Sequence, residues 1–298
     1  MKNTTPFKVS EILCPVDFGE LSSLALKYAA AGAKAYGAGL TVLHAERFEL
    51  PAYFTPGQID ELTRQINAAR IGAQDYLQQH TRKILGPLAD QISIVYQVAD
   101  THPVDAVQAA ATKIGADLIV LGTHGRGGAK RLWLGSVTEN VVREAEVPVF
   151  VVRQKQHEFI DASSSPELKT ILCPVNFSEV ARSAIRVAAS IALQFHARFI
   201  PVCVVEPGDR RNVSEVETEL NSWLGETLTT PCDMQPESRQ GRAAEQIVEL
   251  AHKTKADLVV LGAQHRGSTL GSMFGGTTEL VMRQAPVPVL VVPTPGES

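Results

Sequence analysis

The sequence has no long hydrophobic run and only four cysteines. No apolar stretch approaches the length of a membrane-spanning helix and residues 1–10 do not resemble a signal peptide, so we expect a cytoplasmic protein with no membrane partner. The cysteines form neither a CxxC pair nor a Cys/His set at metal-ligand spacing, which argues against a zinc module or a disulfide scaffold. Cys14 and Cys173 stand inside apolar runs, and we expect both to be buried strand residues.

The chain also lacks a strong charge of either sign. Its 28 Lys and Arg against 32 Asp and Glu give a formal net charge of −4. A broad electrostatic footprint for nucleic acid or an anionic membrane is therefore not expected, although a local basic loop could hold a phosphate. The content of 44% hydrophobic and 20% charged residues is typical of a globular protein, and 298 residues suffice for two domains with separate cores.

The strongest feature of the sequence is an internal repeat. Three segments of the first half return in the second: ILCPVDFGE at 12–20 as ILCPVNFSE at 171–179, ADLIVLG at 116–122 as ADLVVLG at 256–262, and VPVFVV at 147–152 as VPVLVV at 287–292. The first pair is 159 residues apart and the others 140, so the first half carries 19 additional residues in its middle. We predict two domains of one fold, at 1–154 and 168–298, joined by a linker at 154–167.

Each half alternates short apolar runs with helical patterns. In the first half we expect strands at residues 11–16, 40–44, 92–97, 118–122 and 147–152. They are apolar on both faces, as in a parallel sheet that helices cover on each side. The additional residues lie around 48–89, where Pro51 and Pro56 precede a long helical pattern. The predicted class is α/β, with two tandem doubly wound parallel-sheet domains.

A glycine-rich loop follows the fourth predicted strand, where doubly wound sheets bind ligands. It begins at Gly122 and ends at Gly135 and Ser136, where we expect a helix to begin. Glycines let a ligand approach the backbone, and free N–H groups in such a loop and at a helix start bind anions. Cations at Arg126, Lys130 and Arg131 suit a polyphosphate.

Plainer interpretations of this loop stay open. Ser136 and Glu139 have the spacing of a capping box, and Gly127 and Gly128 could form a simple turn. The loop also lacks the Lys-Ser/Thr ending of a P-loop, and it follows the fourth strand rather than the first strand of a dinucleotide fold.

In these motifs the chain resembles the universal stress protein family. The spacing G-x2-G-x9-G-S over residues 122–136 is similar to the nucleotide motif of its ATP-binding members, and Pro-Val-Asp at 15–17 and Val-Pro-Val at 147–149 agree in order and position. The resemblance covers nearly the whole chain twice. It implies an adenine-nucleotide alpha hydrolase-like fold that binds ATP, ADP or AMP, with Mg²⁺ or Mn²⁺ held mainly by the phosphates, and a role in stress response or signalling.

The resemblance also implies a set of ligand-binding residues in the first half. These are Pro15, Asp17, Ala45, Gly122, His124, Gly125, Arg126, Gly135, Ser136, Val137 and Thr138. Asp17 would contact the adenosine, Ala45 would meet the adenine edge through its backbone, and the loop would surround the phosphates. A helix-capping role for Asp17 and a packing role for His124 are the alternatives.

The second half departs from the pattern at three of these positions. Asn176 replaces the aspartate, His265 the second glycine and Gly276 the serine. A side chain at 265 disfavours positive φ and crowds a phosphate. We therefore expect nucleotide mainly in the first half, with the second half structural or contributing a surface.

We find no nucleophile paired with a base, no carboxylate pair and no metal cluster, so we expect a binding module with at most slow ATP hydrolysis. An ATP pyrophosphatase or adenylate-forming enzyme would need a Ser-Gly-Gly-type loop after the first strand, where residues 17–20 stand instead. An interaction scaffold without nucleotide is the other alternative. The last strands of the two halves are apolar and would lie at sheet edges, which invite pairing. The resemblance implies that these strands form the dimer seam, so we expect the two halves to pair across it and whole chains to form a homodimer.

Overall fold

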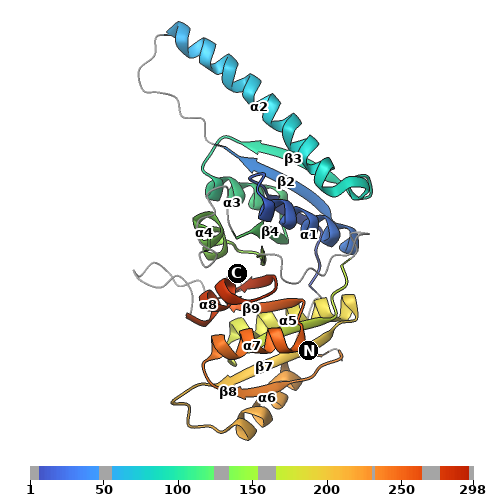
Figure 1. The fold of residues 1–298 in the computed structure, drawn as a ribbon, viewed down its shortest axis with the longest axis vertical. Helices are drawn as coiled ribbons and strands as arrows, with labels where there is room; N and C mark the ends of the chain where they lie inside the picture. Colours follow the sequence, from blue (N-terminus) through green and yellow to red (C-terminus); the bar gives the residue numbers. More distant parts are fainter. Residues whose placement is uncertain are drawn as a thin grey trace.

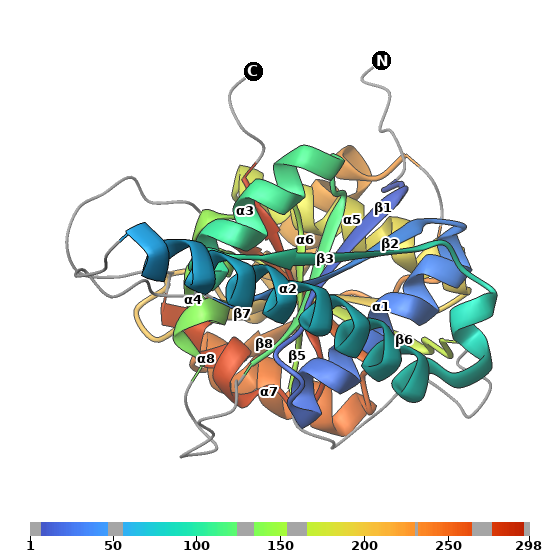
Figure 2. The ribbon, with the colours of Figure 1, turned by 90° about the horizontal axis from the view of Figure 1, so that it is seen from above.

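The computed structural model describes residues 7–46, 56–123, 134–153, 166–229, 232–263 and 276–294. In these residues one ten-stranded sheet runs through both halves, and helices cover both of its faces (Figures 1 and 2). Among them, no helix combines the length and the apolarity that crossing a bilayer requires.

The first half contains the five strands that the sequence predicts, each within two residues of its expected ends. Its elements are β1 (Glu11–Pro15), α1 (Glu20–Tyr36), β2 (Gly39–Ala45), α2 (Pro56–Leu85), the 3₁₀ helix η1 (Gly86–Asp90), β3 (Ile94–Ala99), α3 (Pro103–Ile114), β4 (Leu118–Gly122), α4 (Ser136–Glu144) and β5 (Val149–Val152).

The second half repeats this order. Its elements are β6 (Thr170–Val175), α5 (Glu179–Phe195), β7 (Arg198–Val205), α6 (Val213–Thr227), β8 (Glu237–Gln240), α7 (Ala243–Thr254), β9 (Leu258–Ala263), α8 (Gly276–Gln284) and β10 (Val289–Pro293). Helix α2 has 30 residues and its counterpart α6 has 15, so the additional residues of the first half lie where the sequence places them.

The strand order is β3-β2-β1-β4-β5-β10-β9-β6-β7-β8. Within each half every pairing is parallel, as expected for strands joined by helical crossovers. The halves meet where β5 pairs antiparallel with β10, which sets Phe150 opposite Leu290. The predicted pairing of the two last strands is therefore confirmed, and it places both in the middle of the sheet. A homodimer of whole chains stays a prediction, which crosslinking that recovers only monomers would contradict.

The core lies on both faces of this sheet because successive strand residues point to opposite sides. In β1, Ile12 and Cys14 join the cluster under α1 and α5, whereas Leu13 joins the cluster under α3, α4, α7 and α8. Cys14 and Cys173 are both fully buried, as predicted, and burial raises the pKa of each thiol. A neutral thiol in an apolar strand acts as a packing residue.

Candidate functional site

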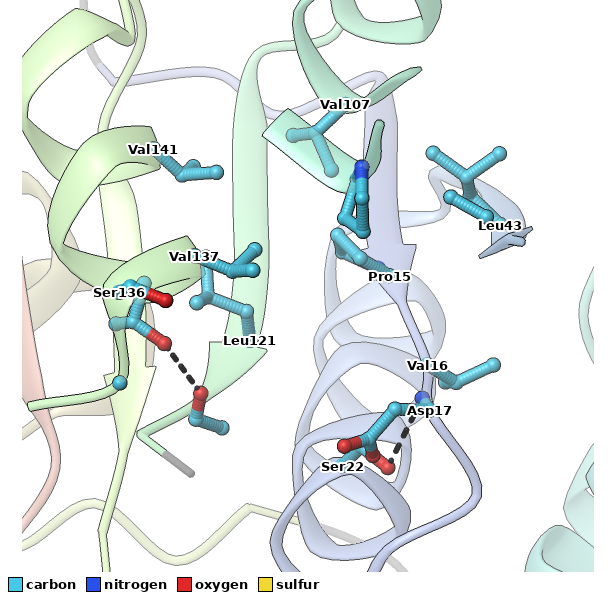
Figure 3. A pocket seen from close by; sticks show the side chains of 15 residues that line it. Pro15, Val16, Asp17, Ser22, Leu43, Val107, Leu121, Ser136, Val137 and Val141 are labelled. Atoms are coloured by element: carbon cyan, nitrogen blue, oxygen red, sulfur yellow. Dashed lines mark hydrogen bonds between the residues drawn. The ribbon is translucent and has the colours of Figure 1, made fainter. Parts of the chain in front are cut away.

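A cavity of about 260 Å³ lies at the carboxyl ends of β1, β2 and β4, beside the starts of α3 and α4 (Figure 3). Its lining includes eight of the predicted ligand residues: Pro15, Asp17, Ala45, Gly122, Gly135, Ser136, Val137 and Thr138. It also includes residues that the sequence did not single out: Val16, Ser22, Leu43, Pro103, Val107, Leu121 and Val141. These eight predicted residues therefore come together at one place on the sheet edge, although this does not test what each residue binds.

The cavity is apolar in its middle and polar at its two sides. Figure 3 shows Asp17 on one side and Ser136 on the other, with Pro15, Leu121 and Val137 between them. Such a slot suits a flat, largely apolar group that carries polar substituents at its ends.

The Asp17 side is built from a tight turn between β1 and α1. Phe18 has a left-handed backbone (φ 65°), which lets Asp17 Oδ1 accept the Gly19 N–H at 3.0 Å. The Ser22 hydroxyl donates to the Gly19 carbonyl at 3.2 Å and fixes the first turn of α1. One carboxylate oxygen of Asp17 thus holds the turn before α1, while the side chain also lines the cavity. Gly19 is the N-cap residue of α1 and the helix has no side-chain cap, so the helix-capping interpretation of Asp17 is wrong.

Aromatic rings hold this turn from behind. The Phe18 ring lies 4.5 Å from that of His44, 4.7 Å from that of Tyr76 and 5.1 Å from that of His80, centroid to centroid. His44 is buried, and its Nδ1 lies 2.9 Å from the Val16 carbonyl oxygen. Burial, with a smaller contribution from the charge of Lys83, lowers the pKa of His80. The carboxylate at the turn is therefore held by a packed cluster.

Gly122 at the end of β4 is required by packing. A Cβ built on it would lie 2.8 Å from the backbone carbon of Leu21 in α1. On the other side, the Thr138 hydroxyl donates to the Gly122 carbonyl at 2.8 Å. From its place in the loop, Gly122 was expected to let a ligand approach the backbone, whereas its close neighbour in the structure is α1.

We expect Gly122→Ala to lower the free energy of unfolding by about 1–3 kcal/mol, because α1 must shift to admit the methyl group. Gly262→Ala should behave alike, since its Cβ would meet Val180 Cγ1 at 2.6 Å. The control is Gly225→Ala in α6, where no atom lies within 4 Å of an added Cβ and the helix should gain slightly. Thermal melts of the three variants check this, and an unchanged melting temperature for both Gly122→Ala and Gly262→Ala would contradict it.

The opposite side of the cavity is the N-terminus of α4. Gly135 is the N-cap residue and Ser136 the first helical residue, so the capping-box interpretation of Ser136 is wrong by one position. The Gly135 N–H donates to the Thr123 carbonyl at 2.7 Å and ties the helix start to β4. The first N–H groups of a helix have no partner within it and carry partial positive charge. This side therefore suits an anion.

Arg153 is a cation that the sequence analysis did not single out. Arg153 is the first residue after β5, and Thr123 is the first residue after β4. The Thr123 N–H donates to the carbonyl of Val152, the last residue of β5, at 3.0 Å, so Arg153 leaves the sheet next to Thr123. Its Nη1 is buried without a hydrogen-bond partner in the described part of the chain, and burial lowers the pKa of Arg153 to about 10. It remains charged at neutral pH. An arginine directly after a buried strand is the sequence signal that could have pointed to it.

His124, Gly125, Arg126, Lys130 and Arg131 lie outside the described residues, and their roles stay predictions. Within the described residues, no group of three His, Cys, Asp or Glu side chains could hold a metal ion.

The sequence of the chain matches a known protein family. The sequence model of the universal stress protein family matches residues 8–153 and 231–293. A universal stress protein of Mycobacterium tuberculosis (strain ATCC 25618 / H37Rv) is 31% identical over 191 residues, which cover 59% of this chain and 61% of the relative. The match thus spans about three-fifths of that relative. A universal stress protein of Methanocaldococcus jannaschii is 27% identical over 156 residues, 49% of this chain and 95% of the relative.

Solved structures agree in fold. The crystal structure of a universal stress protein from Archaeoglobus fulgidus DSM 4304 superposes with a TM-score of 0.66 at 21% identity, covering 98% of this chain and 99% of that one. A putative universal stress protein from Pseudomonas aeruginosa UCBPP-PA14 gives 0.66 at 19% identity, covering 97% and 95%. With the family match over both halves, the chain belongs to the universal stress protein family.

Proposed function

We propose that the first half binds an adenine nucleotide, ATP or its shorter forms ADP and AMP, and that the chain acts as a cytoplasmic nucleotide-responsive binding module in stress response or signalling. The observation that carries the proposal is the cavity of about 260 Å³ between Asp17 and the start of α4. Its apolar middle matches the faces of an adenine ring, and its two ends match a ribose and an anion.

Each end offers the chemistry that its part of the nucleotide needs. A carboxylate such as that of Asp17 accepts hydrogen bonds from ribose hydroxyls. The N–H groups at the start of α4 favour phosphate, and the Arg153 guanidinium adds positive charge at the same edge of the sheet. Mg²⁺ or Mn²⁺ would be held mainly by the phosphates, because the described residues supply no ligand cluster for a metal.

The proposed role is binding rather than catalysis. Efficient phosphoryl transfer needs a positioned nucleophile and stabilisation of charge in the transition state. Among the described residues, the lining of the cavity contains no base beyond Asp17, and one oxygen of that carboxylate accepts the Gly19 N–H. Turnover of ATP, if measured with a sensitive phosphate-release assay, should therefore be slow.

Calorimetric titration with ATP and AMP at matched magnesium tests the proposal. We expect about one site per chain in the wild type. Ala45→Phe, at the half-buried end of β2, should fill the cavity and abolish binding, whereas Val204→Phe at the equivalent register position of β7 should leave ATP binding intact. Lack of ATP binding by folded wild type that was purified without nucleotide would reject the proposal and favour a scaffold. Unchanged binding in folded Ala45→Phe would place the site elsewhere.

An interaction scaffold is the second candidate, and helix α2 is the observation that favours it. The helix extends beyond the sheet in Figure 1, and Ile71 and Tyr76 on it are 66% and 53% exposed. The two functions are compatible, because α2 also contacts the Asp17 turn through the Tyr76 and His80 rings.

A further inference from the structure

The second half has a cavity of its own at the equivalent edge of the sheet. Its volume is about 290 Å³, as large as the first. Its lining consists of Pro174, Val175, Asn176, Ser178, Val180, Ala181, Val202, Val204, Glu206, Ala243, Ile247, Leu261, Gly262, Thr277 and Thr278. Loss of the nucleotide motif in this half has therefore left the hollow open.

The apolar slot of this cavity is retained. By register and repeat, Val202, Val204, Ile247 and Leu261 stand where Leu43, Ala45, Val107 and Leu121 stand in the first half. All of these residues are aliphatic, so the two cavities have similar apolar walls. A flat ring system that fits one slot is thus compatible in shape with the other.

The second cavity has a carboxylate at the start of α7, whereas the described lining of the first cavity has none at the start of α3. Glu206 Oε1 accepts the backbone N–H of Ala243, the first residue of α7, at 3.0 Å. The first half has Pro103 at that helix position, which offers no N–H for a carboxylate to bind. A carboxylate is therefore fixed at the rim of this cavity.

Two features that suit a phosphate in the first half differ in the second, which keeps the N-terminus of α8 beside its cavity. Pro293 stands at the position of Arg153, and Gly276 at that of Ser136. Asn176 keeps the turn of Asp17, since its Oδ1 accepts the Ser178 N–H at 3.3 Å and hydroxyl at 2.6 Å, but it carries no charge. Among the residues that the structure describes, the lining thus includes one carboxylate and no Lys or Arg side chain.

From this arrangement we infer that the second cavity binds an unphosphorylated heterocyclic amine, with an N–H of the ligand donated to the Glu206 carboxylate. The aliphatic walls hold the ring, and Asn176, Thr277 and Thr278 offer polar contacts at its edge. A phosphate on the ligand would bring negative charge toward a fixed carboxylate, which gives selectivity by repulsion as well as by attraction. The choice of adenosine as the probe rests on the proposed function of the first half. The expected preference for an unphosphorylated ligand rests only on the Glu206 carboxylate of the second cavity.

Adenosine and AMP, titrated by calorimetry into Ala45→Phe protein, test the inference in a chain whose first cavity is filled. We expect about one adenosine per chain, with AMP at least tenfold weaker. Adding Val204→Phe should remove adenosine binding. Adding Glu206→Gln instead keeps an acceptor for the Ala243 N–H but removes the charge, and should weaken adenosine by about tenfold or more, as expected for a hydrogen bond to an ionised group. The backbone amide signal of Ala243 should shift with adenosine in the Ala45→Phe spectrum.

Three results would overturn the inference: no adenosine binding by folded Ala45→Phe protein, AMP binding it as tightly as adenosine, or Glu206→Gln leaving adenosine affinity unchanged. The proposed function is judged separately, because ATP titrated into Val204→Phe protein reports on the first cavity alone. Circular dichroism and thermal melts establish that each variant is folded. Failure at one cavity therefore cannot be mistaken for failure at the other.

Discussion

Val151→Asp is expected to lower the free energy of unfolding by about 5 kcal/mol or more, a large share of the stability of an ordinary domain. Val151 is fully buried in β5, opposite Val289 of β10, and the sheet continues on both sides. An isolated carboxyl in such surroundings has a pKa raised by up to 3–5 units, and each unit corresponds to about 1.4 kcal/mol at neutral pH. Because β5 and β10 join the halves, the substitution should disrupt the whole sheet.

The pH dependence of this loss follows from the sign of the shift. A raised pKa means that the folded state tolerates the neutral carboxyl better than the charged one. The cost of charge is therefore absent below the pKa of an unfolded aspartate, roughly 4, and grows as the pH rises above it. Urea unfolding at several pH values measures this trend. Val95→Asp is the control, since Val95 lies on edge strand β3 and is 58% exposed; it should change stability by about 0.5 kcal/mol or less. A Val151→Asp chain as stable as the control would show that the seam contributes little.

The inner strands of the first half were predictable from the sequence because their residues are apolar on both faces. Segments such as 118–122 contain no polar residue, and their recurrence in the second half indicated that both halves share one order of elements. The polar strand β8 (Glu237–Gln240) at the edge of the sheet has no such signal. The pairing of β5 with β10 was also predictable, from the family resemblance together with the apolar character of two strands expected at sheet edges. The length of α2 was visible as 19 additional residues, whereas its extension beyond the sheet depends on tertiary packing (Figure 1).

The sequence predicted which residues lie at the site better than it predicted the structural role of each one. Gly122 looked like a glycine for a ligand, but its missing side chain makes room for the backbone of Leu21, about a hundred positions away in the chain. Ser136 looked like a cap, but Gly135 occupies that position. Likewise, the bond between Glu206 and Ala243 joins residues 37 positions apart and has no local sequence signal. Spacing locates a loop, whereas contacts across elements decide what each position does.

The largest effect on ligand binding is expected from Ser136→Asp. Ser136 is exposed at the first position of α4, where an acidic side chain interacts favourably with the helix dipole. The variant should therefore fold with equal or slightly greater stability. At the same time it sets a negative charge where the proposed phosphates approach. Two unit charges about 5 Å apart repel by roughly 3 kcal/mol at an effective dielectric of about 20, so we expect ATP affinity to fall by about a hundredfold.

Calorimetry with ATP, AMP and adenosine separates repulsion from a lost fold or a blocked cavity. Repulsion acts through the phosphates, so Ser136→Asp should weaken ATP and AMP while leaving adenosine affinity nearly unchanged. Raising the salt concentration should restore part of the ATP affinity, because screening acts on exposed charges. The matched control is Gly276→Asp at the start of α8, which has no atom within 4 Å of an added Cβ and should not alter ATP binding. Equal ATP affinity in wild type and Ser136→Asp would place the phosphates away from α4, and a parallel loss of adenosine would show that the side chain obstructs the cavity instead.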